Sequence, residues 1–228
     1  MLDAEETPQP MSSNIAFPFT THPSATPFAV PASKYLCTFN AAQEDPNNLN
    51  FHTYVITGAL IFDRPIPTRS NTSPSTPKKE LESFEPRILL LQRAATDTLP
   101  NLWEIPGGTC EDGDESILHA VAREVGEETG LMVSSVGPCA GTGYSFVSTG
   151  GRVVRKVNFL VECQSGSEGD EGLEVRLDPD EHRDYVWATE EEVRAGRVGS
   201  VCLRFTMREQ VDVVLEGFQL RRELEMTN

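Results

Sequence analysis

The chain has 228 residues, of which 38% are hydrophobic and 24% charged, and its formal net charge is −16. This length and composition are typical of one soluble domain with a sizeable core and appendages. The negative charge gathers in residues 109–131 and 162–192, and such a surface repels nucleic-acid phosphates and anionic membranes. The balance argues against a nucleic-acid polymer or a membrane as partner.

The cysteines and the N-terminus indicate a compartment. Five widely separated cysteines show neither C-x-x-C pairing nor zinc-ligand spacing. The first residues lack a basic segment followed by a long apolar run, so we expect no signal peptide and no membrane span. Scattered, unpaired thiols fit a reducing compartment. We expect cytoplasmic residence and leave a nuclear share open.

The N-terminal part differs in composition from the rest. Residues 1–27 are rich in Pro, Ser and Thr without a period, so we expect a flexible lead-in. Residues 28–52 are expected to form an extension that packs on the core, with a short strand at 28–30 and a helix from Ser33 to about Ala42. The main domain is then predicted to span residues 53–224.

Two apolar runs predict buried strands early in the main domain. Tyr54 to Phe62 is nearly continuous in apolar residues, and Arg87 to Arg93 is the next such run. Between them, residues 64–86 hold several prolines and are predicted to form a long mobile loop. We expect the two strands to pair as a hairpin with an enlarged connection.

A glycine loop followed by a helix is the most informative stretch. Gly107-Gly108 opens it, and Gly130 closes the helix at a position that favours glycine. Three glutamates of this helix lie at i, i+3 and i+4, and therefore on one face: Glu124, Glu127 and Glu128. Like charges at this spacing repel one another, so the pattern indicates either a solvated helix face or a site for a hard divalent cation.

The opposite face of the same helix favours the second interpretation. Ile117, Val121 and Val125 form an apolar stripe that would seat the helix on a core. Arg123 lies four residues before Glu127 and is positioned to hold its carboxylate.

The residues from Arg123 to Leu131 resemble the end of the Nudix box at every fixed position, and Trp103 to Gly108 resemble the strand and loop that enter it. One departure from the family pattern is visible, because the loop between Gly108 and the helix is one residue longer than in the box. Asp114 has the expected spacing from Gly108 and Glu115 the expected spacing from Arg123, so either acid takes the first acidic position.

The remaining elements complete an α/β pattern. A strand is expected at 132–136, followed by a hairpin of 144–147 with 153–163 and a short strand at 185–187. Thr189 and Glu192 form a capping box for a brief helix that ends at Gly196. A last amphipathic helix is predicted from Phe205 to Arg222. The resemblance implies a Nudix-type α/β/α sandwich, with a mixed sheet between helices.

The resemblance also implies an activity. Members of the Nudix family hydrolyse a nucleoside diphosphate linked to another moiety, so we expect a Mg²⁺-dependent diphosphate hydrolase, with Mn²⁺ as an alternative ion. Two other hypotheses stay open: a Nudix-fold binding or regulatory module without turnover, and a hydrolase of a prenyl or sugar diphosphate. The expected partner is a small diphosphate-containing substrate, and a homodimer is left open.

Roles follow for individual residues. Metal ligands are expected from the helix and the glycine loop: Gly108, Glu124, Glu127 and Glu128. Catalytic roles are expected for the box residues and for a later acid, which competes with Glu127 and His182 as the general base: Arg123, Glu127, Glu128 and Glu181. Substrate contacts are expected from two arginines and an aromatic residue: Arg93, Tyr144 and Arg155. For Arg93 an ion pair with Glu104 or Asp97 is the alternative. Arg152, Arg155 and Lys156 either reach terminal phosphates or solvate a strand edge.

Overall fold

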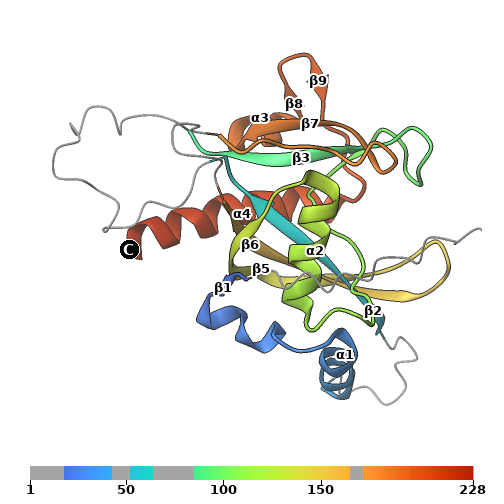
Figure 1. Cartoon of the computed structure of the whole chain (residues 1–228). Coiled ribbons are helices and arrows are strands. Elements are labelled where there is room, and N and C mark those ends of the chain that lie inside the picture. Colours follow the sequence, from blue (N-terminus) through green and yellow to red (C-terminus); the bar gives the residue numbers. More distant parts are fainter. Residues whose placement is uncertain (1–17, 43–51, 64–84, 165–171, 228) are drawn as a thin grey trace, which may run out of the picture.

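The structure is a computed structural model that describes residues 18–42, 52–63, 85–164 and 172–227 (Figure 1). None of the helices in these ranges combines the length and the apolar run that a membrane crossing needs.

The largest sheet is mixed and four-stranded. It contains β1 (Thr20–Thr21), β5 (Val133–Val147), β6 (Val153–Cys163) and β2 (His52–Ile61), in that spatial order. β5 and β6 are antiparallel neighbours, whereas β1 runs parallel to β5 and β2 runs parallel to β6. The predicted hairpin of 144–147 with 153–163 is confirmed within this pair, and the strand predicted at 132–136 is the start of the same long β5.

A second, antiparallel sheet has the order β4 (Trp103–Glu104), β3 (Arg87–Arg93), β7 (His182–Thr189). The predicted hairpin between the first two apolar runs is therefore wrong. β2 pairs along its length with β6, and a single bridge between Phe62 and Ile88 joins it to β3. A segment as long as 64–86 imposes no register on the strands that it connects, so burial selects their partners instead.

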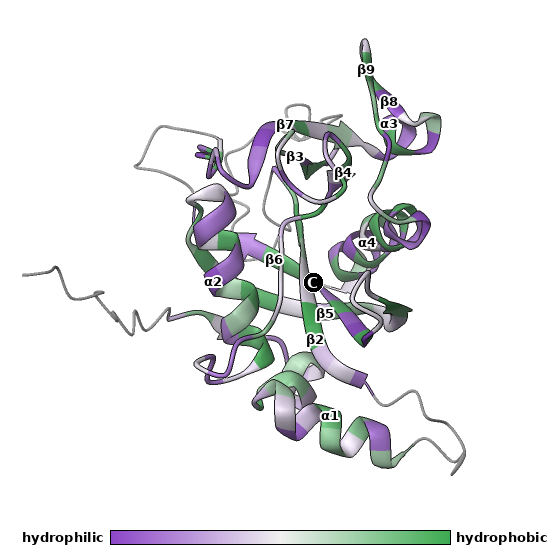
Figure 2. Cartoon of the chain, turned by 90° about the vertical axis from the view of Figure 1, so that its right-hand side faces the viewer, coloured by the Kyte–Doolittle hydropathy of each residue, from purple (hydrophilic) through white to green (hydrophobic). Residues whose placement is uncertain are grey.

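Helices cover both faces of the four-stranded sheet. On β2 and β6, one set of alternating residues, including Val55 and Phe159, packs with α2 (Ile117–Thr129). The other set, including Leu60 and Leu160, packs with α4 (Arg208–Thr227). The Phe62 ring meets the Phe218 ring of α4 edge to face, at 5.0 Å between centroids. These layers confirm the predicted α/β sandwich, and Figure 2 shows the apolar sides of the helices turned towards the strands.

Helix α2 begins and ends where its sequence indicates. Ser116 caps its start by accepting a hydrogen bond from the His119 amide. Gly130 follows its last turn with φ of 68°, a conformation that glycine adopts without strain. The predicted apolar stripe of Ile117, Val121 and Val125 is buried, so the acidic face of the helix points away from this core.

The segment before β2 is more regular than its composition suggests. Residues 18–27, which the sequence placed in a flexible lead-in, include β1 and most of the 3₁₀ helix η1 (Pro23–Phe28). The strand predicted at 28–30 is wrong, because η1 ends at Phe28, whose ring packs edge to face on Phe159. The predicted helix is α1 (Ala32–Ala41), and its Leu36 is buried against the core.

Residues 1–17 of the predicted lead-in and residues 64–84 of the predicted loop lie outside the described ranges. The division of the chain into domains stays a prediction.

The C-terminal elements follow the expected order. The capping box of Thr189 and Glu192 is present at the start of α3 (Glu190–Ala195), and Gly196 follows that helix in a left-handed conformation. A small two-stranded hairpin comes next: β8 (Arg197–Val198) with β9 (Val201–Cys202). α4 begins at Arg208, slightly later than the predicted Phe205.

Candidate active site

An open cavity of about 720 Å³ lies between the two sheets and the ends of α2 and α4. Its wall includes the loop between β3 and β4, the Gly107-Gly108 loop, residues of α2, β6 and the start of β7, and the first turn of α4. This volume is within the range of small-molecule sites. The cavity is polar where α2 meets the glycine loop, and the residues there build the candidate site.

Both glycines of the loop bring the backbone against the glutamates of α2. The Gly107 amide donates a hydrogen bond of 2.6 Å to Oε2 of Glu128. A methyl group at Gly108 would lie 2.6 Å from the carboxyl carbon of Glu124, closer than atoms can approach. The carbonyl of Gly108, expected near a metal, accepts a hydrogen bond of 2.8 Å from the Thr57 amide. The glycine pair therefore seats two carboxylates at the cavity wall.

The environment of these two carboxylates disfavours their charge. Burial and the negative charges of Glu104, Glu124 and Glu181 raise the pKa of Glu128 well above its usual range, although the Gly107 amide opposes the shift. Burial also raises the pKa of Glu124 to about 7, a shift that Arg123 opposes and Glu127 adds to. Carboxyl groups that raise one another's pKa in this way are stabilised in the ionised form by a bound cation.

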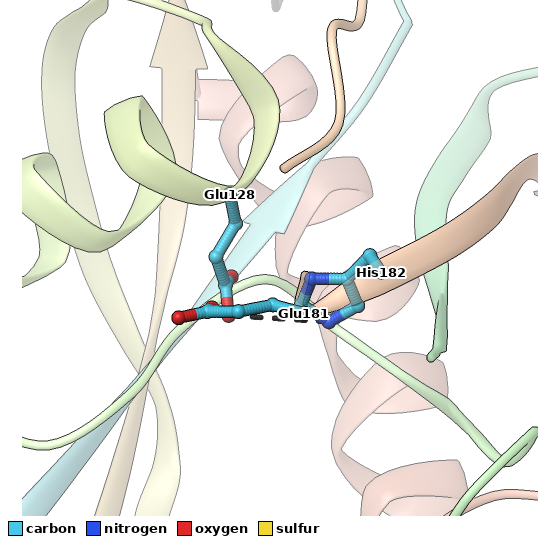
Figure 3. A group of neighbouring side chains, drawn as sticks. All are labelled: Glu128, Glu181 and His182. Atoms are coloured by element: carbon cyan, nitrogen blue, oxygen red, sulfur yellow. Dashed lines mark ion pairs between the residues drawn. The ribbon is translucent and has the colours of Figure 1, made fainter. Parts of the chain in front are cut away.

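The side chains of Glu128, Glu181 and His182 converge, and their potential ligand atoms lie within 4.8 Å of one another (Figure 3). His182 is the first residue of β7 and Glu181 lies in the turn just before it, whereas Glu128 comes from the last turn of α2. Glu124 lines the same cavity. A donor set dominated by carboxylate oxygens fits a hard divalent cation such as Mg²⁺ or Mn²⁺.

Arg123 ties the entry loop to the helix. Its guanidinium donates to Asp114 at 3.0 Å (to Oδ1) and 3.1 Å (to Oδ2), and to the carbonyl of Thr109 at 2.9 Å. The side chain of Asp114 is 8% exposed, whereas that of Glu115 is 78% exposed and lies 3.5 Å from His119. Of the two acids that compete for the first acidic position of the box, Asp114 is the one that contacts the arginine.

Glu127 lies apart from the other two glutamates. Its side chain is 58% exposed and accepts a hydrogen bond of 2.9 Å from Arg123. Among the described residues that line the cavity are Glu124 and Glu128, but not Glu127. The expected ligand role of Glu127 would require its carboxylate to exchange this ion pair for the cation.

Arg93 lines the cavity, but its guanidinium is occupied. It forms ion pairs with Asp97 and Glu104 and donates to the carbonyl of Thr98 at 2.7 Å. Burial alone would raise the pKa of Glu104, but a hydrogen bond to His182 and the charges of Lys156 and Arg93 outweigh it and hold that pKa below its usual value. Arg93 is thus found in the ion pair that the sequence offered as its alternative role.

Two other residues that were predicted to contact the substrate, Arg155 and Tyr144, have their contacts outside the cavity. Arg155 lies over the Phe39 ring, 4.5 Å from its centroid, and donates to the Thr142 carbonyl. Tyr144 packs on the core cluster beneath α4. Neither is among the described residues that line the cavity, whereas their neighbours Phe146 and Lys156 are. The alternation of side chains along a strand predicts that Arg155 and Lys156 face opposite sides of the sheet. It does not predict which of the two faces the cavity.

Comparison with known proteins agrees with this geometry. The NUDIX domain family model matches residues 81–204, which is more than half of the chain. The chain belongs to the Nudix family. This membership confirms the resemblance seen in the Arg123 to Leu131 stretch and assigns the chain to a family of hydrolases.

Individual Nudix proteins cover different shares of the chain. A Mycobacterium tuberculosis protein that bears the name MutT4 is 39% identical over 75 residues, which are 32% of this chain and 30% of that protein. The chain therefore spans under a third of the length of this curated relative.

Two solved structures are among those similar to this chain. The MutT Nudix hydrolase from Burkholderia pseudomallei is 21% identical with a TM-score of 0.46, and 71% of this chain and 97% of that chain are covered. The Ap4A hydrolase of C. elegans is 14% identical with a TM-score of 0.49, and the shares are 75% and 98%. At such scores these likenesses carry no conclusion about substrate.

Proposed function

We propose that the chain is a divalent-cation-dependent hydrolase that cleaves a phosphoanhydride bond in a small diphosphate-containing molecule, such as a nucleoside diphosphate derivative. The observation that carries the proposal is the convergence of Glu124, Glu128 and Glu181 on one cavity beside the Gly107-Gly108 loop. Family membership supports the same reaction class.

The two helix glutamates are the primary ligands in this proposal. Glu124 and Glu128 are fixed by the glycine loop and by α2, and each has a raised pKa that a cation would reverse. A bound Mg²⁺ would neutralise the diphosphate and acidify the attacking water. Arg123 acts as a positioning residue because it holds Asp114, Glu127 and the Thr109 carbonyl around the entry loop.

Glu181 is the proposed general base. Its side chain is exposed and lines the cavity close to Glu128 and His182. In the reaction a water oxygen forms a new bond to phosphorus, one bridging P–O bond breaks, and the base receives the proton of the water. His182 is buried and donates from Nε2 to the Glu104 carboxylate at 3.3 Å, so it orients that carboxylate and is a weaker candidate for the base.

A substrate panel tests the function directly. Purified protein with Mg²⁺ is incubated with nucleotide sugars, dinucleoside polyphosphates, oxidised dNTPs and prenyl diphosphates, and phosphorylated products are separated by ion exchange. We expect cleavage of at least one class and its loss when EDTA replaces Mg²⁺. Cleavage that persists in EDTA contradicts the proposed site, and binding without cleavage across the panel favours the regulatory module.

A further inference from the structure

Lys156 is a buried cation inside the acidic cavity. It lies on β6 in register with Ile56 of β2 and Tyr144 of β5. Because successive strand residues point to opposite faces, Lys156 faces the cavity while Arg155 faces α1. The residue is only 5% exposed, so most of its side chain is removed from water, while its ammonium still opens onto the cavity.

The ammonium of Lys156 has no protein partner in the described part of the chain. Among the described residues, no hydrogen bond and no ion pair is formed by the ammonium of Lys156, although an ammonium carries three donors. The nearby carboxylates have other partners: Glu104 is bound by Arg93 and His182, and Glu128 accepts from the Gly107 amide. Burial lowers the pKa of Lys156, and the charges of Glu104 and Glu128 only partly restore it.

The second basic side chain of the cavity wall is not available to a ligand. Arg93 uses its guanidinium on Asp97, Glu104 and the Thr98 carbonyl. Among the Lys and Arg residues of the described wall, Lys156 is therefore the one whose donors are unused. A cation on the cavity wall whose donors have no partner in the described chain is placed to bind an anionic ligand.

Building on the proposed function, we propose that Lys156 binds an anionic phosphoryl oxygen of the substrate diphosphate. A neutral carbonyl or hydroxyl group would leave the buried charge without a counter-charge, whereas a phosphoryl oxygen supplies both the charge and an acceptor for the ammonium donors. Of the basic residues that the sequence offered for a phosphate contact, Lys156 takes it in this proposal in place of Arg93 and Arg155. It acts beside the carboxylates rather than as one of the metal ligands.

The test compares two lysine variants that change the net charge equally. Lys156→Met removes the ammonium group and keeps a long, unbranched apolar side chain. Lys34→Met removes an exposed charge on α1. The probe is methylenediphosphonate, a diphosphate that cannot be hydrolysed, titrated calorimetrically in the presence of Mg²⁺. We expect Lys156→Met to weaken binding about 10- to 100-fold, as for loss of a charged hydrogen bond. We expect Lys34→Met to bind within about twofold of the wild type.

Stability separates this role from a structural one. Lys156→Met removes the cost of burying the ammonium and also its attraction to Glu104 and Glu128, so these opposed effects should leave the melting temperature close to that of the wild type. Unchanged probe binding overturns the proposal, and so does a loss of binding that only accompanies a lower melting temperature. If the variant does not fold, ¹⁵N NMR of the lysine ammonium groups in the wild type decides: the probe must shift the Lys156 signal, and an unshifted signal overturns the proposal.

Failure of the inference and failure of the proposed function remain distinguishable. A wild type that binds the probe through Lys156 but hydrolyses no member of the substrate panel overturns the hydrolase and keeps the phosphate contact. A wild type that hydrolyses a diphosphate, with Lys156→Met binding the probe equally well, overturns the contact and keeps the hydrolase.

Discussion

The two acidic segments of the chain, residues 109–131 and 162–192, look alike in composition and behave differently in the fold. In the first, Glu124 and Glu128 are pressed against the Gly107-Gly108 loop, and burial together with neighbouring carboxylates raises their pKa values. In the second, burial alone would raise the pKa of Glu190, but hydrogen bonds from Arg222 and Arg194 outweigh it and lower that pKa. Acidic side chains are dense in both segments. In the first, carboxylates still raise one another's pKa although Arg123 forms an ion pair of 3.0 Å with Glu124, and a bound cation would relieve this effect.

Two acids of the second segment also contribute to the candidate site. Asp180 and Glu181 of the second segment line the same cavity as the glutamates of α2. Elsewhere in its described part, Glu190 pairs with Arg194 and Arg222, and Glu174 pairs with Arg176, whose side chain is exposed like that of Glu174. Variants that remove one acid from each group therefore sharpen the comparison.

The largest effect is expected for Glu128→Gln. It removes a proposed metal ligand that the fold buries and keeps the side-chain shape, so turnover of the substrate found in the panel should fall about 1,000-fold or more. The fold should persist, because α2 is seated by its opposite face. The measurement is kcat at saturating Mg²⁺, with Glu115→Gln as the matched exposed control. Wild-type turnover in Glu128→Gln would show that the metal site is wrongly assigned.

Glu181→Gln should separate proton transfer from metal binding. Loss of a general base lowers kcat about 100- to 10,000-fold, while the increase in melting temperature on adding Mg²⁺ should remain. Glu190→Gln, in the same acidic segment, should leave kcat unchanged because Glu190 pairs with Arg194 and Arg222 outside the cavity. Equal kcat values for Glu181→Gln and the wild type would return the role of base to another residue.

Metal and pH should act together on stability. The folded protein holds a proton on Glu124 more tightly than the unfolded chain, because its pKa rises from 4.5 to about 7. This contribution is present below about pH 4.5 and is lost as the pH rises through about 7. Added Mg²⁺ binds the ionised form, so at about a hundredfold excess over Kd it should add about 2.7 kcal/mol at pH 8 and less at pH 5.

Melting temperatures with Mg²⁺ and with EDTA at both pH values measure this linkage. Glu124→Gln is the control, since it should weaken the pH dependence of the Mg²⁺ effect. An Mg²⁺ effect that is equal at pH 5 and pH 8 would contradict a cation held by Glu124 and Glu128.

A smaller effect should distinguish the two acids before the helix. Asp114→Asn weakens a half-buried pair with Arg123 and should lower the free energy of unfolding by about 1–3 kcal/mol. Glu115→Gln, on an exposed side chain, should change it by less than about 0.5 kcal/mol. Urea denaturation measures both values. If the two variants lose stability equally, Arg123 does not depend on Asp114.

The sequence predicted those features that local chemistry determines. The helix with its glycine end, the buried stripe of Val121 and Val125, and the capping box at Thr189 each depend on residues a few positions apart. The partner of β2 could not be predicted in this way, because β6 is distant along the chain and no turn links the two strands. The same limit applies to the site, where acids within one helix were identifiable but their contacts with other elements were not.

The arginines illustrate that limit. Arg93 was a sound candidate for a phosphate contact by position, yet Asp97 and Glu104 reach it only once β3 and β4 pair. Arg155 and Lys156 are adjacent and equally basic, and the packing of α1 and α4 on opposite faces decides which one enters the cavity.

The contact between Phe62 and Phe218 bears on how this protein can be shortened. Both rings lie outside residues 81–204, the part that the family model matches. Phe62 directly follows β2, and Phe218 belongs to α4. A fragment trimmed to that match would lose both edge strands of the large sheet, β1 and β2, together with α4, leaving side chains such as Leu90 and Leu160 open to water. Such a fragment should precipitate, so the smallest stable unit must include these flanking elements.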